Sequence, residues 1–352
     1  MKAAYWITSA LITAAGLCLM GLGRNHVIAK TNTERKSETV TFGVPNSVSA
    51  DLSGTTVSSE IVGSTDADGA TVMMKDVPST VKVEMQDNVL IITDVRVEGS
   101  HFINAPLTAE DEGTITVTIP QEPMDTIDVT LDTGDLTAGG IQANAITLKT
   151  DTGTLDAEAL EATNIGLSTD TGAISTTRLT AEYLNIETDT GRISSQYDGS
   201  MASTISTDTG AITLDSHAAV ELNVQSQSGG LTIDKTNVAD TVDIRTDTGF
   251  VKVTDSELHS SVNFETDTGR LTFSNCRFDG TTSIISDTGS IELNASLGDE
   301  TYLSTDTGRV TLHLIGAESE YRIEQDETTI GSGSRFVSVD AGHDAEITFS
   351  QN

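Results

Sequence analysis

The sequence predicts an all-β protein: a β-solenoid of about ten coils of 19–20 residues, with an irregular β region before it and one apolar helix at the N-terminus. Three observations lead to this prediction. The tripeptide Asp-Thr-Gly occurs nine times, and most copies lie 19 or 20 residues apart. Apolar and polar residues alternate around each copy, and this period of two is typical of β-strands. A short, constant period indicates units that must stack in order to bury a core.

Residues 1–23 are predicted to be a signal anchor or a signal peptide. Ala3 to Gly23 holds no charged residue over 21 positions, which is long enough for a helix to span a bilayer. The alternative fate is secretion after cleavage near a small residue such as Ala29. Residues 24–38 are polar and are expected to be a spacer. Their positive charges, taken literally, favour the opposite orientation, but we expect the long acidic body to lie outside the cell membrane.

Residues 39–125 are predicted to be an irregular β region that caps the repeats. The runs Val81–Met85, Val89–Ile92 and Thr114–Pro120 alternate like strands but lack the repeated tripeptide. An uncovered solenoid end is a strand edge that invites unwanted pairing. We therefore expect residues 39–125 to cap one end of the stack and residues 313–352 to cap the other.

Residues 126–312 are predicted to be the repeat solenoid. The one long gap between Asp-Thr-Gly copies, from Asp208 to Asp247, contains Gln227-Ser228-Gly229 in the missing register, 19 residues after Asp208. Each repeat is expected to form a short strand, a corner, a second short strand and a polar return. Stacked at the strand spacing of about 4.8 Å, ten coils give a rod of about 50 Å.

The candidate site residues are those of the corners, and their expected role is structural. An aspartate can accept a hydrogen bond from the amide two residues on, and glycine tolerates a positive φ. Gly191→Val is therefore expected to strain its corner by about 1–3 kcal/mol. The corner residues are Asp132, Gly134, Asp151, Gly153, Asp170, Gly172, Asp189, Gly191, Asp208, Gly210, Gly229, Asp247, Gly249, Asp267, Gly269, Asp287, Gly289, Asp306 and Gly308.

Catalysis is not expected from these corners. Asp-Thr-Gly also surrounds the catalytic aspartates of aspartic proteases, where two carboxylates share a proton. Nine copies at constant spacing would lie in one column along a rod, which forms no closed cleft. A polysaccharide-acting solenoid enzyme is the remaining enzymatic alternative, and no sequence motif selects its residues.

No metal or cofactor site is predicted. A column of carboxylates could attract calcium or other cations loosely, but the Gly-Gly-x-Gly-x-Asp pattern of calcium-binding β-rolls is absent. The six histidines have no ligand spacing. Cys18 and Cys276 lie far apart, so no disulfide framework is expected, and Cys276 is predicted to be a small buried side chain.

The charge balance excludes nucleic acid as a partner. The chain has 53 Asp and Glu against 19 Lys and Arg, a formal charge of −34 at pH 7. Such a surface repels phosphate backbones. The expected ligand is an unidentified envelope or surface molecule, either protein or glycan.

The chain resembles the bacterial putative-adhesin family of β-strand-repeat proteins. The resemblance is carried by Ile115–Pro120, by the run Ile127–Gly134 and by the repeated Thr-Asp-Thr-Gly units. It implies an extracytoplasmic, often membrane-anchored solenoid without catalytic residues. The function expected is therefore that of a cell-surface interaction module. A membrane-tethered accessory or sensor partner in an envelope-stress system is the alternative.

Overall fold

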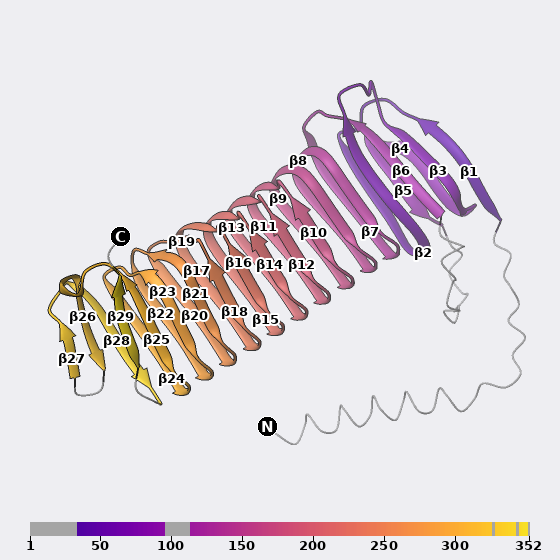
Figure 1. The fold of residues 1–352 in the computed structure, drawn as a ribbon. Helices are drawn as coiled ribbons and strands as arrows, with labels where there is room; N and C mark the ends of the chain where they lie inside the picture. Colours follow the sequence, from indigo (N-terminus) through magenta and orange to yellow (C-terminus); the bar gives the residue numbers. More distant parts are fainter. Residues whose placement is uncertain (1–33, 96–112, 326–327, 343–344, 351–352) are drawn as a thin grey trace, which may run out of the picture. The chain divides into compact units, whose positions relative to one another are not determined.

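The computed structural model describes residues 34–95, 113–325, 328–342 and 345–350. These residues form one continuous all-β stack, and the expected solenoid of about ten coils is confirmed (Figure 1). The apolar segment Ala3–Gly23 and the cleavage position at Ala29 lie outside the described residues. Within the described ranges, no helix is long and apolar enough to cross a membrane.

Each coil consists of three straight segments separated by corners. One coil shows them separately, as β18 (Val251–Thr254), β19 (Glu257–Leu258) and β20 (Ser261–Thr268). In other coils the short segment merges with its neighbour. The remaining repeat strands are β7 (Met124–Thr133), β8 (Leu136–Thr152), β9 (Leu155–Thr171), β10 (Ile174–Thr177), β11 (Thr180–Thr190), β12 (Ile193–Gln196), β13 (Gly199–Thr209), β14 (Ile212–Asp215), β15 (Ala218–Ser228), β16 (Leu231–Asp234), β17 (Asn237–Thr248), β21 (Leu271–Phe278), β22 (Thr281–Thr288), β23 (Ile291–Ser296), β24 (Glu300–Thr307) and β25 (Val310–Ile315).

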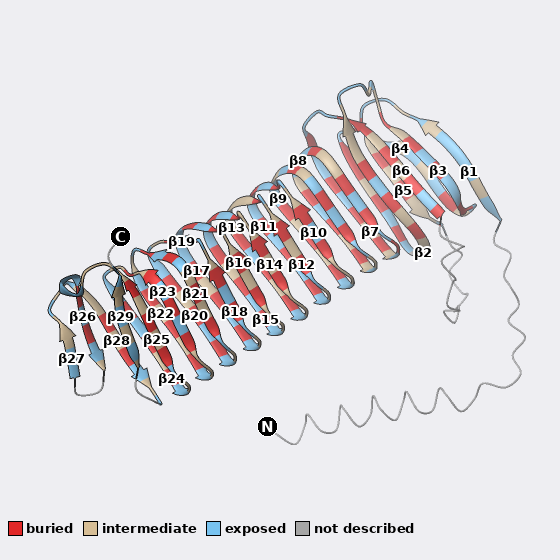
Figure 2. Cartoon of the chain, viewed as in Figure 1, coloured by how far each residue is buried: buried red, intermediate tan, exposed pale blue. Residues whose placement is uncertain are grey.

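The strands of successive coils pair in parallel, and each residue pairs with the residue one repeat later in the sequence. This register places like residues in columns along the stack, because every second side chain of a strand points inward. One inward column consists of Ile186, Ile205, Val224, Ile244, Phe264, Ile284 and Leu303. All of its members are buried, and burial of each such side chain contributes about 1.5–3 kcal/mol. The buried positions alternate with exposed ones along each strand (Figure 2).

The N-terminal end of the stack begins with a coil that lacks the tripeptide. This coil is β2 (Ser47–Ser64), which pairs in parallel with β7 and β8 of the first repeat coil. On its other side β2 pairs in parallel with two strands of the N-terminal region, β5 and β6. The strands of that region are β1 (Arg35–Thr41), β3 (Thr71–Pro78), β4 (Val81–Gln86), β5 (Val89–Asp94) and β6 (Gly113–Pro120).

These N-terminal strands turn from parallel to antiparallel pairing. β4 and β5 form a hairpin whose turn residues Asp87 and Asn88 both have positive φ, as a two-residue hairpin turn requires. β1 pairs only with β3 among the described strands, and it carries Arg35, Lys36 and Glu38. Charged side chains on an edge strand discourage pairing with further chains.

The C-terminal end closes with another coil that lacks the tripeptide. β28 (Arg335–Ala341) pairs in parallel with β24, and β29 (Glu346–Ser350) with β25. A segment inserted before this coil contains the 3-10 helix η2 (Glu318–Glu320) and the hairpin of β26 (Tyr321–Gln325) and β27 (Thr328–Gly331). Tyr321, the first residue of β26, is fully buried.

Candidate functional site

The predicted corner residues lie along one edge of the stack, where the long segment of each coil ends. At each corner the residue before the aspartate is buried, and the aspartate itself is exposed or half-buried. Gln227 replaces the aspartate in one coil and donates through its side chain to Asp208 Oδ1 at 2.7 Å. Lys149 Nζ lies 3.4 Å from Asp151 Oδ1. The edge therefore presents a row of mostly acidic side chains to solvent.

The predicted aspartate-to-amide hydrogen bond is not made within the repeat corners. The described carboxylates of Asp151, Asp170, Asp189, Asp208, Asp247, Asp267, Asp287 and Asp306 do not accept from the glycine two residues on. The corner glycine amides from Gly134 to Gly289 donate to the next coil instead, as Gly191 N does to Thr209 O at 3.0 Å. The expected bond does occur in the first coil, where Ser53 N donates to Asp51 Oδ1 at 3.1 Å.

The requirement for glycine at Gly191 comes from close approach between coils. Its φ lies outside the left-handed region, so the expectation that a positive φ requires this glycine is wrong. A Cβ built on Gly191 would lie 1.7 Å from the carbonyl oxygen of Gly172 in the preceding coil. No side chain fits there without separating the two coils.

In six coils the buried threonine or serine before the aspartate also holds the corner. Thr150 Oγ1 donates to Gly134 O at 3.0 Å, and Thr305 Oγ1 to Gly289 O at 2.9 Å, across neighbouring coils. The same bond recurs at Thr169, Thr188, Thr207 and Ser286. The sequence signal for these residues was the threonine that precedes nearly every Asp-Thr-Gly, which our prediction left without a role.

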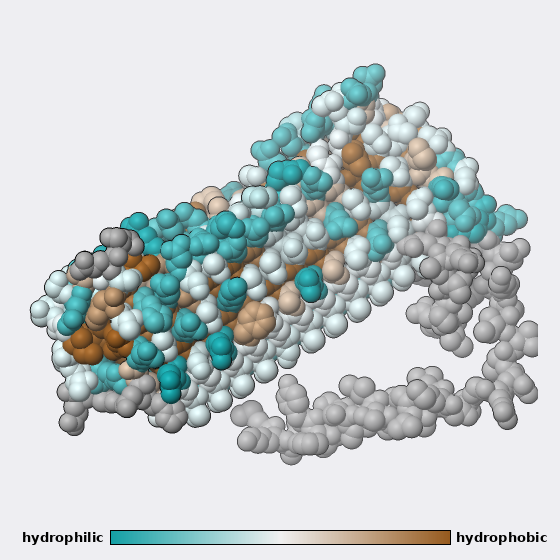
Figure 3. Space-filling view, in the orientation of Figure 1, coloured by the Kyte–Doolittle hydropathy of each residue, from teal (hydrophilic) through white to brown (hydrophobic). Residues whose placement is uncertain are grey.

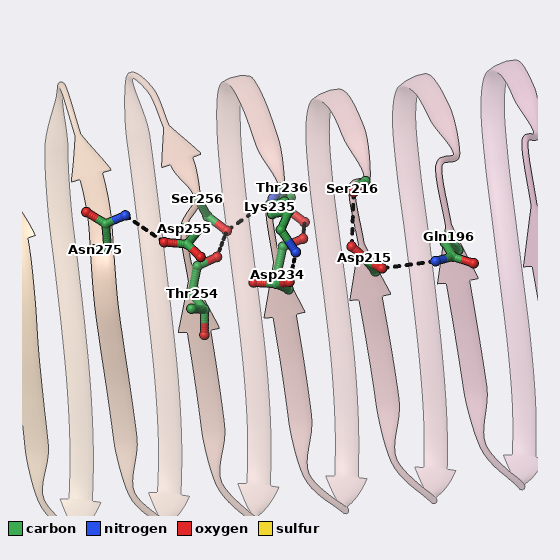
Figure 4. A network of polar contacts seen from close by, with 10 residues as sticks. All are labelled: Gln196, Asp215, Ser216, Asp234, Lys235, Thr236, Thr254, Asp255, Ser256 and Asn275. Atoms are coloured by element: carbon green, nitrogen blue, oxygen red, sulfur yellow. Dashed lines mark hydrogen bonds and ion pairs between the residues drawn. The ribbon is translucent and has the colours of Figure 1, made fainter.

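The opposite corner of each coil uses a residue in the left-handed conformation. Tyr197, Ser216, Lys235 and Asp255 occupy it in four successive coils, with φ between 48° and 57°. Polar side chains at and beside this corner form hydrogen bonds and ion pairs, both within a coil and between neighbouring coils (Figure 4). The bonds include Gln196 Nε2 to Asp215 Oδ2 at 3.0 Å, Lys235 Nζ to Asp234 Oδ2 at 2.6 Å and Asn275 Nδ2 to Asp255 Oδ1 at 2.6 Å.

Inside the stack, one core column changes from apolar to polar near its middle. Leu160 and Leu179 occupy this column in two coils, and Asp198, His217 and Thr236 follow in the next three. All five are buried; Asp198 is 1% exposed and His217 is 0% exposed. An ionisable group without solvent must be satisfied by internal hydrogen bonds.

The side chains around Asp198 and His217 satisfy both groups. Asp198 Oδ1 accepts from the amide of Leu179 at 2.8 Å, and Oδ2 accepts from Ser195 Oγ at 2.8 Å and from the hydroxyl of Thr176. The imidazole of His217 contacts Ser195 Oγ through Nδ1 at 3.2 Å. Burial raises the pKa of Asp198 despite these bonds, and burial lowers the pKa of His217 to about 4.

The second ring nitrogen of His217 leads toward the surface. His217 Nε2 lies 2.9 Å from Ser203 Oγ, and Ser203 Oγ lies 2.5 Å from Ser200 Oγ. Ser203 is buried, whereas Ser200 is half-buried. We call Ser195, Asp198, Ser200, Ser203 and His217 the polar core cluster. The sequence did not reveal this cluster, because His217 meets the other four members, which lie in the preceding coil, only when the coils stack.

A protein-family model matches the first coil and most of the repeat coils. Residues 52–257 match the family model described as Toastrack DUF4097, which is more than half of the chain. The chain belongs to the Toastrack family. The family expected from the sequence is confirmed, and the match includes both the first coil, which lacks the tripeptide, and most of the repeat coils of this Toastrack chain.

Solved structures similar to this Toastrack chain include two putative adhesins and a putative lipid binding protein. A putative adhesin from Bacteroides fragilis is 20% identical, with 72% of this chain and 98% of that chain covered at a TM-score of 0.32. A putative adhesin from Parabacteroides distasonis is 13% identical, covering 88% and 98% at a TM-score of 0.32. A putative lipid binding protein from the same species is 11% identical, covering 90% and 98% at 0.24. No curated protein matches the chain.

The Toastrack stack has a surface hollow of about 580 Å³ near its C-terminal end. Arg277 Nε contacts Asp279 Oδ1 at 2.7 Å, and Arg335 Nη1 contacts Glu320 Oε2 at 3.1 Å, so each guanidinium of the lining is paired with a carboxylate. The hollow is lined by Arg277, Asp279, Ser296, Ile315, Gly316, Ala317, Glu320 and Arg335.

Neither the hollow nor the repeat edge assembles reactive groups. In the described ranges, no group of three or more His, Cys, Asp or Glu is placed to hold a metal ion. The thiol of Cys276, near the hollow, is buried, and burial raises its pKa to about 11, which keeps it protonated and weakly nucleophilic. The most regular features of the Toastrack chain are therefore its long outer faces (Figure 3), where apolar and hydrophilic rows run along the stack.

Proposed function

We propose that this Toastrack chain is a non-catalytic, extracytoplasmic surface module, anchored in the cell membrane through residues 3–23. Its rod would serve as a spacer and contact surface for an envelope or surface ligand, protein or glycan, in an adhesion role. The observation that carries this proposal is the unbroken parallel stack from β2 to β25 and the last coil, which converts the chain into long, solvent-exposed columns of repeated side chains.

Two properties support an extended interaction surface outside the cell. The stack repeats the same outward positions every 19 or 20 residues, so a ligand with its own repeat could contact several coils at once. The net charge of −34 keeps the rod soluble and disfavours polyanionic partners. The acidic edge would at most gather loosely held calcium or other cations.

The experiment is cell fractionation combined with protease shaving of intact cells. The full chain is compared with a variant that lacks residues 1–29. We expect the full chain in the membrane fraction with its repeats digested from outside, and the variant absent from that fraction. Digestion only after lysis would contradict the proposal and favour an intracellular scaffold.

A binding experiment separates the adhesion role from the alternative of a tethered accessory protein. A purified adhesin rod should bind matrix components or other cells directly. An accessory or sensor partner of an envelope-stress system should instead co-purify with other membrane proteins and leave those surfaces unbound.

A further inference from the structure

The protonation state of Asp198 determines which atom donates in each hydrogen bond of the polar core cluster. With Asp198 ionised, Oδ2 can only accept, so the single proton of Ser195 points to it. Ser195 must then accept from His217 Nδ1–H, which leaves Nε2 as an acceptor for the hydroxyl of Ser203. Ser203 in turn accepts from Ser200. Every bond therefore points inward, from the half-buried Ser200 to the buried carboxylate.

The same atoms support the opposite direction when one proton is added. A proton arriving from solvent at Ser200 Oγ lets the Ser200 hydroxyl proton pass to Ser203, and the Ser203 proton pass to His217 Nε2. The Nδ1 proton then moves to Ser195, and the Ser195 proton moves to Asp198 Oδ2. Asp198 now donates to Ser195, and every bond points outward. Each hydroxyl keeps one proton, and the imidazole stays neutral in both states.

The remaining contacts of Asp198 are compatible with both states. Oδ1 accepts from Leu179 N at 2.8 Å irrespective of the proton on Oδ2, and the oxygen of a protonated Oδ2 can still accept from Thr176. A partly satisfied internal network would be costly, whereas this network is complete in either direction.

No other ionisable group enters this part of the described core. The inward neighbours from the adjoining coils are Thr176 and Leu179 on one side and Thr236 on the other. The charged side chains of these coils are exposed or half-buried instead. Arg178 pairs with Glu158, and Asp215 accepts from Gln196 and Ser216. The added proton can therefore reside only on Asp198 or His217.

We propose that the polar core cluster is a buried, two-state proton relay, in which one proton taken up by Asp198 reverses every hydrogen bond between Asp198 and Ser200. The raised pKa of Asp198 and the lowered pKa of His217, both caused by burial, place the added proton on the carboxylate. The relay makes the centre of the rod responsive to the pH at its surface while the imidazole remains uncharged.

The test follows the tautomer of His217 by nitrogen NMR. The full chain, in detergent micelles, carries nitrogen-15 in its six histidines, and loss of one signal in His217→Gln assigns the resonance. At neutral pH we expect the proton on Nδ1. On acidification it should move to Nε2 without formation of an imidazolium, and the ratio of the two tautomers should change about tenfold per pH unit.

Two outcomes would overturn the relay. His217 could keep its proton on one nitrogen over the whole pH range in which the chain is folded, or it could become an imidazolium directly. His259 is the internal reference, because its Nδ1 lies 2.8 Å from Asp279 Oδ2 and the side chain is partly exposed.

Variants at the two ends of the relay sharpen the test. In Asp198→Asn the side-chain amide can donate to Ser195, as the protonated carboxyl would. His217 should therefore carry its proton on Nε2 at every pH, and a proton on Nδ1 would contradict the relay. Ser200→Ala leaves Ser203 without an acceptor in the reversed state and should move the tautomer exchange to lower pH. Ser200→Thr keeps the hydroxyl and should restore the exchange. If Asp198→Asn does not fold, the titration of the unmodified chain still decides.

Discussion

The close approach of successive coils at the glycine corner predicts a large effect of a very small substitution. The Cβ of Gly191→Ala would lie 1.7 Å from Gly172 O, whereas real Cβ contacts essentially never fall below 3.0 Å. The coils must therefore separate locally by at least about 1.3 Å, the difference between these two distances. Strand pairing cannot persist across such a gap.

The magnitude follows from the ladder bonds beside this contact. Gly172 N donates to Thr190 O at 3.1 Å, and Ile174 N donates to Arg192 O at 2.9 Å. A shift of 1.3 Å takes both beyond hydrogen-bonding distance. Two buried bonds left unmade cost about 2–6 kcal/mol, about twice the 1–3 kcal/mol expected from backbone strain.

The assay is urea unfolding followed by circular dichroism, with native-state hydrogen exchange to locate the loss. Gly166→Ala is the matched control, because a Cβ there meets nothing within 4 Å and replacement of a strand glycine should stabilise by up to about 1 kcal/mol. We expect faster exchange confined to the coils around Gly191. Equal stability of the two variants would refute the close-contact account.

Three further predictions concern the core. Thr188→Val removes the hydrogen bond to Gly172 O and should lower the free energy of urea unfolding by about 1 kcal/mol. Thr246→Val removes a buried hydroxyl without a partner and should be neutral or stabilising. Equal losses of stability in the two variants would contradict this account. Phe273→Ala, in an aromatic cluster with ring centroids 4.8 and 5.7 Å apart, should cost about 3–5 kcal/mol, and a cost below 1 kcal/mol would show that the ring is not packed as described. The lowered pKa of His217 means that the unfolded chain binds more protons between pH 6.5 and 4, so this group should reduce stability as the pH falls through that window, by up to about 3 kcal/mol. His217→Thr should remove this decline in pH-dependent urea titrations, and an unchanged pH dependence would contradict it.

Sequence periodicity predicted the stack because the inward columns and the corners repeat within the chain. Ile186 and Ile205, one repeat apart, are paired residues of neighbouring coils. The terminal coils were harder to recognise. Leu52 and Thr56 of β2 pair with Leu131 and Thr133, and between them β2 carries Ser53-Gly54-Thr55 where the repeat carries Asp132 alone. Their place in the stack is defined by pairing with residues far away in the sequence.

Local turn chemistry explains only part of the corner. The predicted positive φ occurs at Gly134, Gly153, Gly172, Gly249 and Gly289, but not at Gly191. Sequence reasoning assigned Gly191 a conformational role, but the constraint is the carbonyl of Gly172 in another coil. The threonine hydroxyls act across coils for the same reason, as Thr188 does toward Gly172. The repeat spacing places Asp198 and His217 in one column, since they are 19 positions apart, but the hydrogen bonds that join them through Ser195 appear only in the stacked coils.

The central claim, a packed rod outside the cell membrane, is tested most directly by labelling two adjacent positions with a membrane-impermeant maleimide on intact cells. Glu187 is exposed and Thr188 is buried in the same strand, and the native Cys276 is buried. Glu187→Cys should be labelled on intact cells, and Thr188→Cys only after denaturation, with the unmodified chain as background. Labelling of Glu187→Cys only after lysis would place the rod inside the cell, and equal labelling of both variants on intact cells would contradict the packed coil.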